Sequence, residues 1–200
     1  EKLNFFHLIP SQDLGGAENA AKTCIKIDDK DFIFRTYFIN NKKSKNKIIK
    51  RLISEFRNYL KGLKFFLKKN NLVLISSLWK SAFLACLVKL FIPKTKIILF
   101  LHSSKNSHFL DKFFTSLVFL TANEVWADSQ NTLLMRLDEL IFKRKIIKTK
   151  VVSFLLRRLN PVVYGEKIEF NFIYWGRLHK VKNLKKSIEF FKEFYSIDKT

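Results

Sequence analysis

The chain has 200 residues, of which 48% are hydrophobic, so it is not a generally disordered chain and has enough apolar side chains for one well-buried domain. Its formal net charge of +21 suits nucleic acid, anionic lipid or nucleotide phosphates as partners. Two isolated cysteines, Cys24 and Cys86, make no disulfide framework and favour free thiols in a reducing compartment. No run of 18 apolar residues occurs, so the sequence predicts no membrane-spanning helix.

The first elements predict alternating strands and helices. Residues 3–9 are a short apolar run ended by Pro10 and predict a buried strand. A turn with Gly15 and Gly16 leads into an Ala-rich helix over 17–27, and a strand rich in β-formers follows over 32–38.

The same alternation continues through the middle of the chain. Apolar residues recur at helical spacing from Ile49 to Leu67 and predict a long amphipathic helix. Further strands are predicted over 72–76, 97–101, 124–128 and 151–154, and helices over 84–91, 109–120 and 129–142. Strands joined by crossover helices, with continuous apolar runs, indicate an α/β fold with a Rossmann-like, doubly wound parallel sheet.

A second domain is predicted to begin near the end of the chain. Residues 170–175 read as a new strand, and 183–196 as an amphipathic helix. We therefore expect an N-terminal Rossmann-like domain over 1–160, a linker over 161–169, and the first βα unit of a second Rossmann-like domain over 170–200.

Ligands in open α/β sheets bind beyond the carboxyl ends of the strands, so the candidate site lies there. Gly15 and Gly16 open the first helix, where free N–H groups can receive an anion, although a plain strand-to-helix turn is the alternative. Neither a dinucleotide fingerprint nor a P-loop is present. Arg177 and Lys182 follow the strand of the second domain and could hold a diphosphate, with a solvated basic loop as the alternative.

Two further strand ends carry polar side chains. His102 ends the fourth strand, and its imidazole can donate to a sugar hydroxyl or act as a base, although a lone histidine is often structural. Asp128 and Ser129 end the fifth strand, and Ser129 can simply cap the next helix. The histidine spacing predicts no metal site. No Ser/His/Asp or Cys/His nucleophile arrangement is apparent in the sequence.

In this order, these motifs resemble family 4 of the glycosyltransferases, retaining enzymes with the GT-B fold. The resemblance spans the chain and rests on Leu14-Gly15-Gly16-Ala17-Glu18, Ile97–His102, Ala122–Ser129 and Phe172–Leu178 with Lys182-Asn183. It implies transfer of a sugar from a nucleoside diphosphate sugar to a glycan or lipid-linked acceptor, in the synthesis of lipopolysaccharide or another surface polysaccharide. No metal cofactor is implied.

The resemblance also implies roles for individual residues. Gly15, Gly16, Arg177 and Lys182 would bind the donor diphosphate, and His102 would be catalytic, touching the transferred sugar. Glu18 and Ser129 would be cleft candidates. The family's Asn-Gly after the sixth strand is missing from Phe154–Arg158, and its paired glutamates would lie beyond Thr200. We therefore expect a fragment that by itself turns over little or no donor.

The long amphipathic helix predicts a peripheral contact with an anionic membrane. Its candidate contact residues are Lys50, Arg51, Arg57, Lys61, Lys64 and Lys68. The alternative is an apolar stripe packed on the sheet with its lysines solvated. The expected location is the cytoplasm, at the inner face of the plasma membrane. The rival function is a basic Rossmann-like module that binds nucleic acid or a membrane surface without catalysis, but no nucleic-acid recognition motif occurs, so nucleic acid is not an expected partner.

Overall fold

The computed structural model describes residues 2–12, 15–40, 48–143, 147–152 and 183–197. The chain divides into two compact units, Glu1–Arg158 and Leu159–Thr200. In the second unit the described part is helix α6 (Leu184–Ile197), where the sequence predicted a helix over 183–196. The strand predicted over 170–175, the linker, Arg177 and Lys182 lie outside the described residues.

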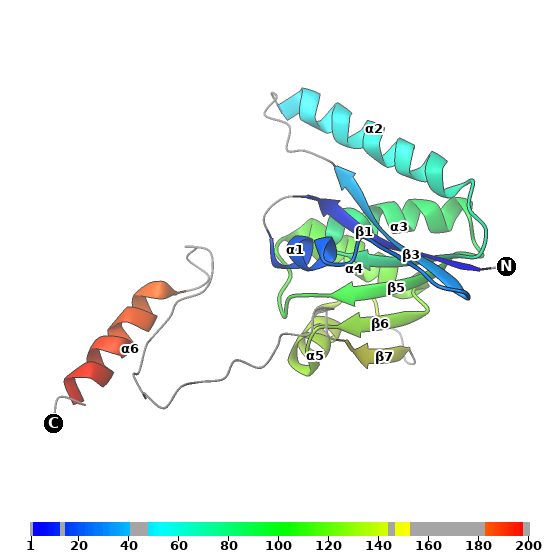
Figure 1. Cartoon of the computed structure of the whole chain (residues 1–200). Coiled ribbons are helices and arrows are strands. Elements are labelled where there is room, and N and C mark those ends of the chain that lie inside the picture. Colours follow the sequence, from blue (N-terminus) through cyan, green and yellow to red (C-terminus); the bar gives the residue numbers. More distant parts are fainter. Residues whose placement is uncertain (1, 13–14, 41–47, 144–146, 153–182, 198–200) are drawn as a thin grey trace. The chain divides into compact units, whose positions relative to one another are not determined.

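The first unit is built on a seven-stranded sheet with the order β2-β3-β1-β4-β5-β6-β7 (Figure 1). The strands are β1 (Leu3–Ser11), β2 (Lys26–Asp28), β3 (Phe32–Asn40), β4 (Leu72–Ser77), β5 (Lys96–Leu101), β6 (Glu124–Ala127) and β7 (Lys148–Val151). Each neighbouring pair is parallel except β2 and β3. The predicted α/β class and parallel, Rossmann-like sheet are confirmed.

Helices follow most of the strands. They are α1 (Gly16–Lys22), α2 (Ile48–Phe66), α3 (Trp79–Phe91), α4 (Phe109–Thr121) and α5 (Gln130–Glu139). One face of the sheet packs against α2, α3 and α4 and carries the larger core, which includes Leu74, Leu99, Phe66 and Val118. The other face carries a smaller cluster around Val73, Ile75, Ile98 and Phe100.

The expected end of the first strand at Pro10 is wrong. Strand β1 continues through Pro10, and Ser11 pairs with Asn40 of β3. On the other side of β1, pairing with β4 ends at Leu8 and Ser76. Beyond that point β1 has a neighbouring strand on one side only, so a residue without an N–H donor is tolerated there.

The helix predicted over 17–27 is also wrong in its second half. Helix α1 ends at Lys22, and Thr23 donates its hydroxyl to the carbonyl of Ala20, 2.6 Å away. Residues Lys26–Asp28 then pair antiparallel with β3 as the short edge strand β2. The apolar spacing here is shared by a helix and a strand, and pairing with β3 decides between them.

The elements at the far edge of the sheet shift as well. Helix α5 ends at Glu139 instead of continuing to 142, because Leu140 is extended. Strand β7 occupies Lys148–Val151 instead of 151–154, and Val152 closes it by donating its N–H to the carbonyl of Ala127, 2.8 Å away. The register with β6, from Glu124–Lys148 to Ala127–Val151, fixes these bounds.

Candidate functional site

Three polar side chains lie on the same face of the sheet, in or just after three neighbouring strands. Side chains alternate between the faces of a strand, so Ser77 shares the face of Val73 and Ile75, and His102 that of Phe100. His7 lies on β1, Ser77 ends β4, and His102 follows β5 directly. Because β1, β4 and β5 are neighbours, these residues line up across the sheet.

Hydrogen bonds join these side chains. Nε2 of His7 and Nε2 of His102 both lie 2.8 Å from Oγ of Ser77. Asp128 follows the next strand, β6, and its Oδ2 lies 4.0 Å from Nδ1 of His102. We call His7, Ser77, His102 and Asp128 the polar row. It runs from the buried interior at His7 and Ser77 to the exposed carboxylate of Asp128.

Both histidines of the row are neutral at neutral pH. Burial and, to a smaller extent, the nearby His102 together lower the pKa of His7 to about 3. Burial also lowers the pKa of His102 to about 4, although the carboxylate of Asp128 opposes that shift. The contact between His102 and Asp128 is therefore not an ion pair.

The single hydroxyl hydrogen of Ser77 fixes the direction of the hydrogen bonds. Ser77 can donate to one imidazole and must accept an N–H from the other. Asp128 stands on the Nδ1 side of His102, which favours the tautomer with hydrogen on that nitrogen. His7 then donates from Nε2 to Ser77, Ser77 donates to Nε2 of His102, and the Nδ1–H of His102 points toward Asp128.

The spacing of His102 and Asp128 at the end of the row suits a bridging hydroxyl oxygen. Nδ1 of His102 and Oδ2 of Asp128 are too far apart at 4.0 Å for a direct hydrogen bond. A hydroxyl oxygen fits within about 2.8 Å of both atoms, accepting from the imidazole and donating to the carboxylate. The pair is therefore suited to a substrate hydroxyl.

Serine, histidine and aspartate thus meet here, although no such arrangement is apparent in the sequence. The side chain of Ser77 is not suited to attack on a substrate, because the residue is 0% exposed and its Oγ contacts two imidazoles. An acyl group cannot reach that oxygen without opening the core. Ser77 therefore positions His102.

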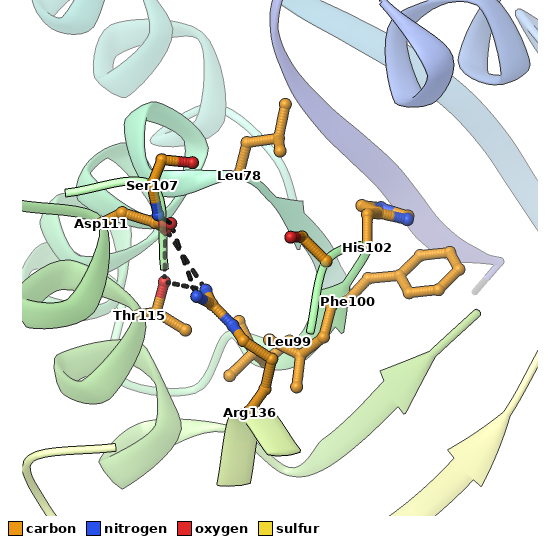
Figure 2. A pocket seen from close by; sticks show the side chains of 10 residues that line it. Leu78, Leu99, Phe100, His102, Ser107, Asp111, Thr115 and Arg136 are labelled. Carbon is orange, nitrogen blue, oxygen red and sulfur yellow. Dashed lines mark hydrogen bonds and ion pairs between the residues drawn. The ribbon is translucent and has the colours of Figure 1, made fainter. Parts of the chain in front are cut away.

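A second polar cluster lies beside the end of β5, on the side of α4 and α5. Arg136 of α5 donates to Asp111 of α4 (Nη2–Oδ1, 3.3 Å), to Thr115 and to Asn106. Figure 2 shows the guanidinium directed at Asp111 and Thr115, and the imidazole of His102 directed away from them. Asp111 also accepts the N–H of Ser107, 2.8 Å away, so the cluster anchors the loop that follows His102.

A pocket of about 40 Å³, room for a few water molecules, separates the cluster from His102. Leu78 borders it and has a left-handed backbone, with φ 70°. With ψ at 158°, this conformation is almost confined to glycine and costs another residue about 1–3 kcal/mol, and it makes the sharp turn from Ser77 into α3. The turn after β4 and the anchored loop after β5 fix the backbone at the carboxyl ends of these two strands.

The predicted phosphate turn lies at the same edge of the sheet, after β1. Gly15 is the N-cap of α1 and Gly16 is exposed. A Cβ at Gly15 would lie 1.9 Å from a carboxylate oxygen of Glu18, so this side chain folds back over the turn. Glu18 complements the partial positive charge of the helix N-terminus, and it must turn away before an anion can bind there.

Ser129 has a structural role as the N-cap of α5. Its Oγ accepts the N–H of Thr132 at 3.1 Å and donates to the hydroxyl of Thr132 at 3.0 Å. The capping alternative raised from the sequence therefore accounts for both of its hydrogen bonds. Asp128, one residue earlier, is the side chain of this strand end that faces His102.

His7 and Ser77 were not predicted from the sequence as residues of the site. His7 lies in the middle of the apolar strand β1 and Ser77 ends β4, and the bonding partners are 70 and 25 residues apart. They could have been found by combining the alternation of side chains along each strand with the β1-β4-β5 order of a doubly wound sheet. That combination places positions 7, 77 and 102 on one face.

Neither family models nor curated proteins give a match to the sequence. Among the residues that the structure describes, no three His, Cys, Asp or Glu side chains are grouped to hold a metal ion. No helix in the described part is long and apolar enough to cross a membrane. The fold and the polar row together define a Rossmann-like α/β protein with two neutral histidines joined through a serine toward the carboxyl edge of its sheet.

Proposed function

We propose that the chain belongs to a metal-independent, retaining glycosyltransferase with the GT-B fold. The reaction would transfer a sugar from a nucleoside diphosphate sugar to a glycan or lipid-linked acceptor of a cell-surface polysaccharide. The observation that supports this most is the exposed end of the polar row. There a neutral His102 and the carboxylate of Asp128 lie 4.0 Å apart at the ligand-binding edge of the sheet.

The role proposed for His102 follows from its neutral state. A neutral imidazole with hydrogen on Nδ1 donates to a sugar hydroxyl, and the Asp128 carboxylate accepts the hydrogen of the same hydroxyl. The transferred ring is thereby oriented with its reacting carbon beside the site. Ser77 and His7 hold the imidazole at this position through Nε2.

The donor diphosphate is proposed to bind Gly15, Gly16, Arg177 and Lys182. Gly15 and Gly16 would contribute backbone N–H groups from the first domain, with Glu18 turned away. Arg177 and Lys182, from the start of the second, would neutralise the leaving diphosphate without a metal ion. The enzyme would work at the cytoplasmic face of the plasma membrane, where lipid-linked acceptors are presented.

The test is ligand-observed NMR with a panel of nucleoside diphosphate sugars. Saturation transferred from the chain should be strongest on the sugar protons of one donor, and His102→Ala should abolish it. His108→Asn is the matched control, because it removes an exposed imidazole but keeps a residue that can cap α4. If no donor receives saturation, or if the His102 variant binds like the wild type, the proposal fails.

A further inference from the structure

Helix α2 buries a different face from the one that its sequence pattern suggests. The buried side chains are Tyr59, Leu63 and Phe66, and Tyr59 packs edge-on against Phe83 of α3 with centroids 4.8 Å apart. Gly62 brings the helix close to α3, since a Cβ there would lie 3.1 Å from Leu84. The helix is thus fixed to the molecule through this side.

Most of the apolar stripe of α2 therefore faces away from the core. The exposed members lie three, four or seven residues apart on one side of the helix and its C-terminal extension, and comprise Ile49, Leu52, Ile53, Phe56, Leu60 and Leu67. Phe56 is 61% exposed. Figure 1 shows α2 at the outer margin of the helical layer, beside β3 and α3. The alternative in which the whole stripe packs on the sheet is wrong.

An exposed basic stripe runs beside the apolar one. Its members follow the apolar residues by one position, about 100° around the helix, and comprise Lys50, Arg57, Lys61, Lys64 and Lys68. Arg51 also lies in α2, and its side chain is outside the described part. The helix has one acidic residue, Glu55, which pairs with Lys80 of α3 at 2.7 Å between Oε1 and Nζ. The negative charge of Glu55 is therefore directed toward α3 and away from the basic stripe.

We propose that this surface of α2 lies on an anionic lipid bilayer. The apolar side chains would enter the boundary between headgroups and acyl chains, and the neighbouring lysines and Arg57 would contact lipid phosphates. A second copy of the chain fits less well, because it would bring another +21 of charge to the same surface. A nucleic acid would leave the Ile, Leu and Phe side chains without a partner. The proposal does not depend on glycosyl transfer.

Co-sedimentation of the full 200-residue chain with vesicles tests the surface. Binding should require phosphatidylglycerol in a phosphatidylcholine bilayer and weaken with salt. Phe56→Ser should weaken it about tenfold. Phe91→Ser is the matched control, because Phe91 is 58% exposed at the end of α3 and should leave binding unchanged.

A second pair of variants tests the charges. Lys61→Gln with Lys64→Gln should weaken binding about thirtyfold at low salt. The control, Lys94→Gln with Lys96→Gln, removes two exposed lysines elsewhere and should have little effect. All substituted residues are exposed, and circular dichroism checks that each variant is folded.

Three results would overturn the proposal. The first is the absence of binding to anionic vesicles, or binding indifferent to lipid charge and to Phe56→Ser. The second is self-association in sedimentation velocity that Phe56→Ser abolishes, without vesicle binding, which would make a second copy the occupant. The third is retention of DNA or RNA on filters that the Lys61 and Lys64 variant loses, again without vesicle binding.

Discussion

Two groups of polar side chains lie at the end of β5, and they differ in how they avoid the free-energy cost of burying charge. The Arg136–Asp111 cluster keeps its charges and encloses them, with partners on α4, on α5 and in the loop at Asn106 and Ser107. In the polar row, by contrast, the two histidines are uncharged, because burial lowers the pKa of His7 and of His102.

The two groups differ in exposure, and this difference gives them different expected roles at the same edge of the sheet. The closed charged cluster directs both terminal nitrogens of Arg136 to protein groups and holds a loop in place, although the buried Nε of Arg136 has no hydrogen-bond partner. The neutral histidines of the polar row lead to the carboxylate of Asp128, whose side chain is 37% exposed and can contact a ligand. The cluster should therefore govern stability, and the exposed end of the row should govern binding.

The largest expected effect is on the charged cluster. Asp111→Ala leaves Arg136 buried without its carboxylate and should lower the free energy of unfolding by about 3–5 kcal/mol. Urea denaturation measures the change. Asp138→Ala is the control, because Asp138 is exposed and 3.9 Å from Lys143, so its loss should cost less than about 0.5 kcal/mol. Equal losses for the two variants would contradict the assignment.

A smaller effect is expected on the pH dependence of the free energy of unfolding, and it arises from the two histidines of the polar row. The pKa values of His7 and His102 fall from 6.5 to about 3 and about 4, so the unfolded chain binds more protons than the folded one between these values and 6.5. The stabilisation is complete above pH 6.5 and is lost as the pH falls. From pH 6 to 5 the two histidines should together remove about 2 kcal/mol from the free energy of unfolding.

The variant His7→Gln sharpens this prediction. It removes one of the two titrating groups, so the decrease between pH 6 and pH 5 should fall to about half. Urea denaturation at each pH, on the variant and the wild type, provides the comparison. An unchanged pH slope would mean that His7 is not buried as a neutral group.

The smallest effect compares two neighbouring serines that are both 0% exposed. Ser77→Ala removes the hydroxyl between two imidazoles and should cost about 1–2 kcal/mol. Ser76→Ala removes a hydroxyl without a hydrogen-bond partner and should be neutral or stabilising. Urea denaturation decides, and similar costs for the two variants would argue against the hydrogen bonds of the row.

Apolar patterns sufficed to predict the sheet, because buried parallel strands such as Leu72–Ser77 are continuous apolar runs. They could not place β2, since Ile25 and Ile27 suit a helix and a strand alike and only pairing with β3 distinguishes the two. His102 was predicted from its position at a strand end. Ser77 was not, because its role depends on imidazoles brought to it by strand order.

Helix α2 shows a further limit of pattern reading. Its apolar periodicity predicted the helix correctly, with Ile48–Phe66 observed against 49–67 expected. The same periodicity does not say which side is buried, because Gly62 and the aromatic Tyr59 set the packing face. Small and aromatic residues at a helix contact were the informative signal here.

The outer strands of the sheet bear on the tendency of this phenylalanine-rich chain to aggregate. Strand β2 has three residues, with Lys26 and Asp28 exposed, and β7 has four, with Lys148 and Lys150 exposed. Short edges that carry lysines are poor templates for another strand, because pairing would bring like charges together. With 22 Phe in the chain, these two edges should protect it from assembling into aggregates through its sheet.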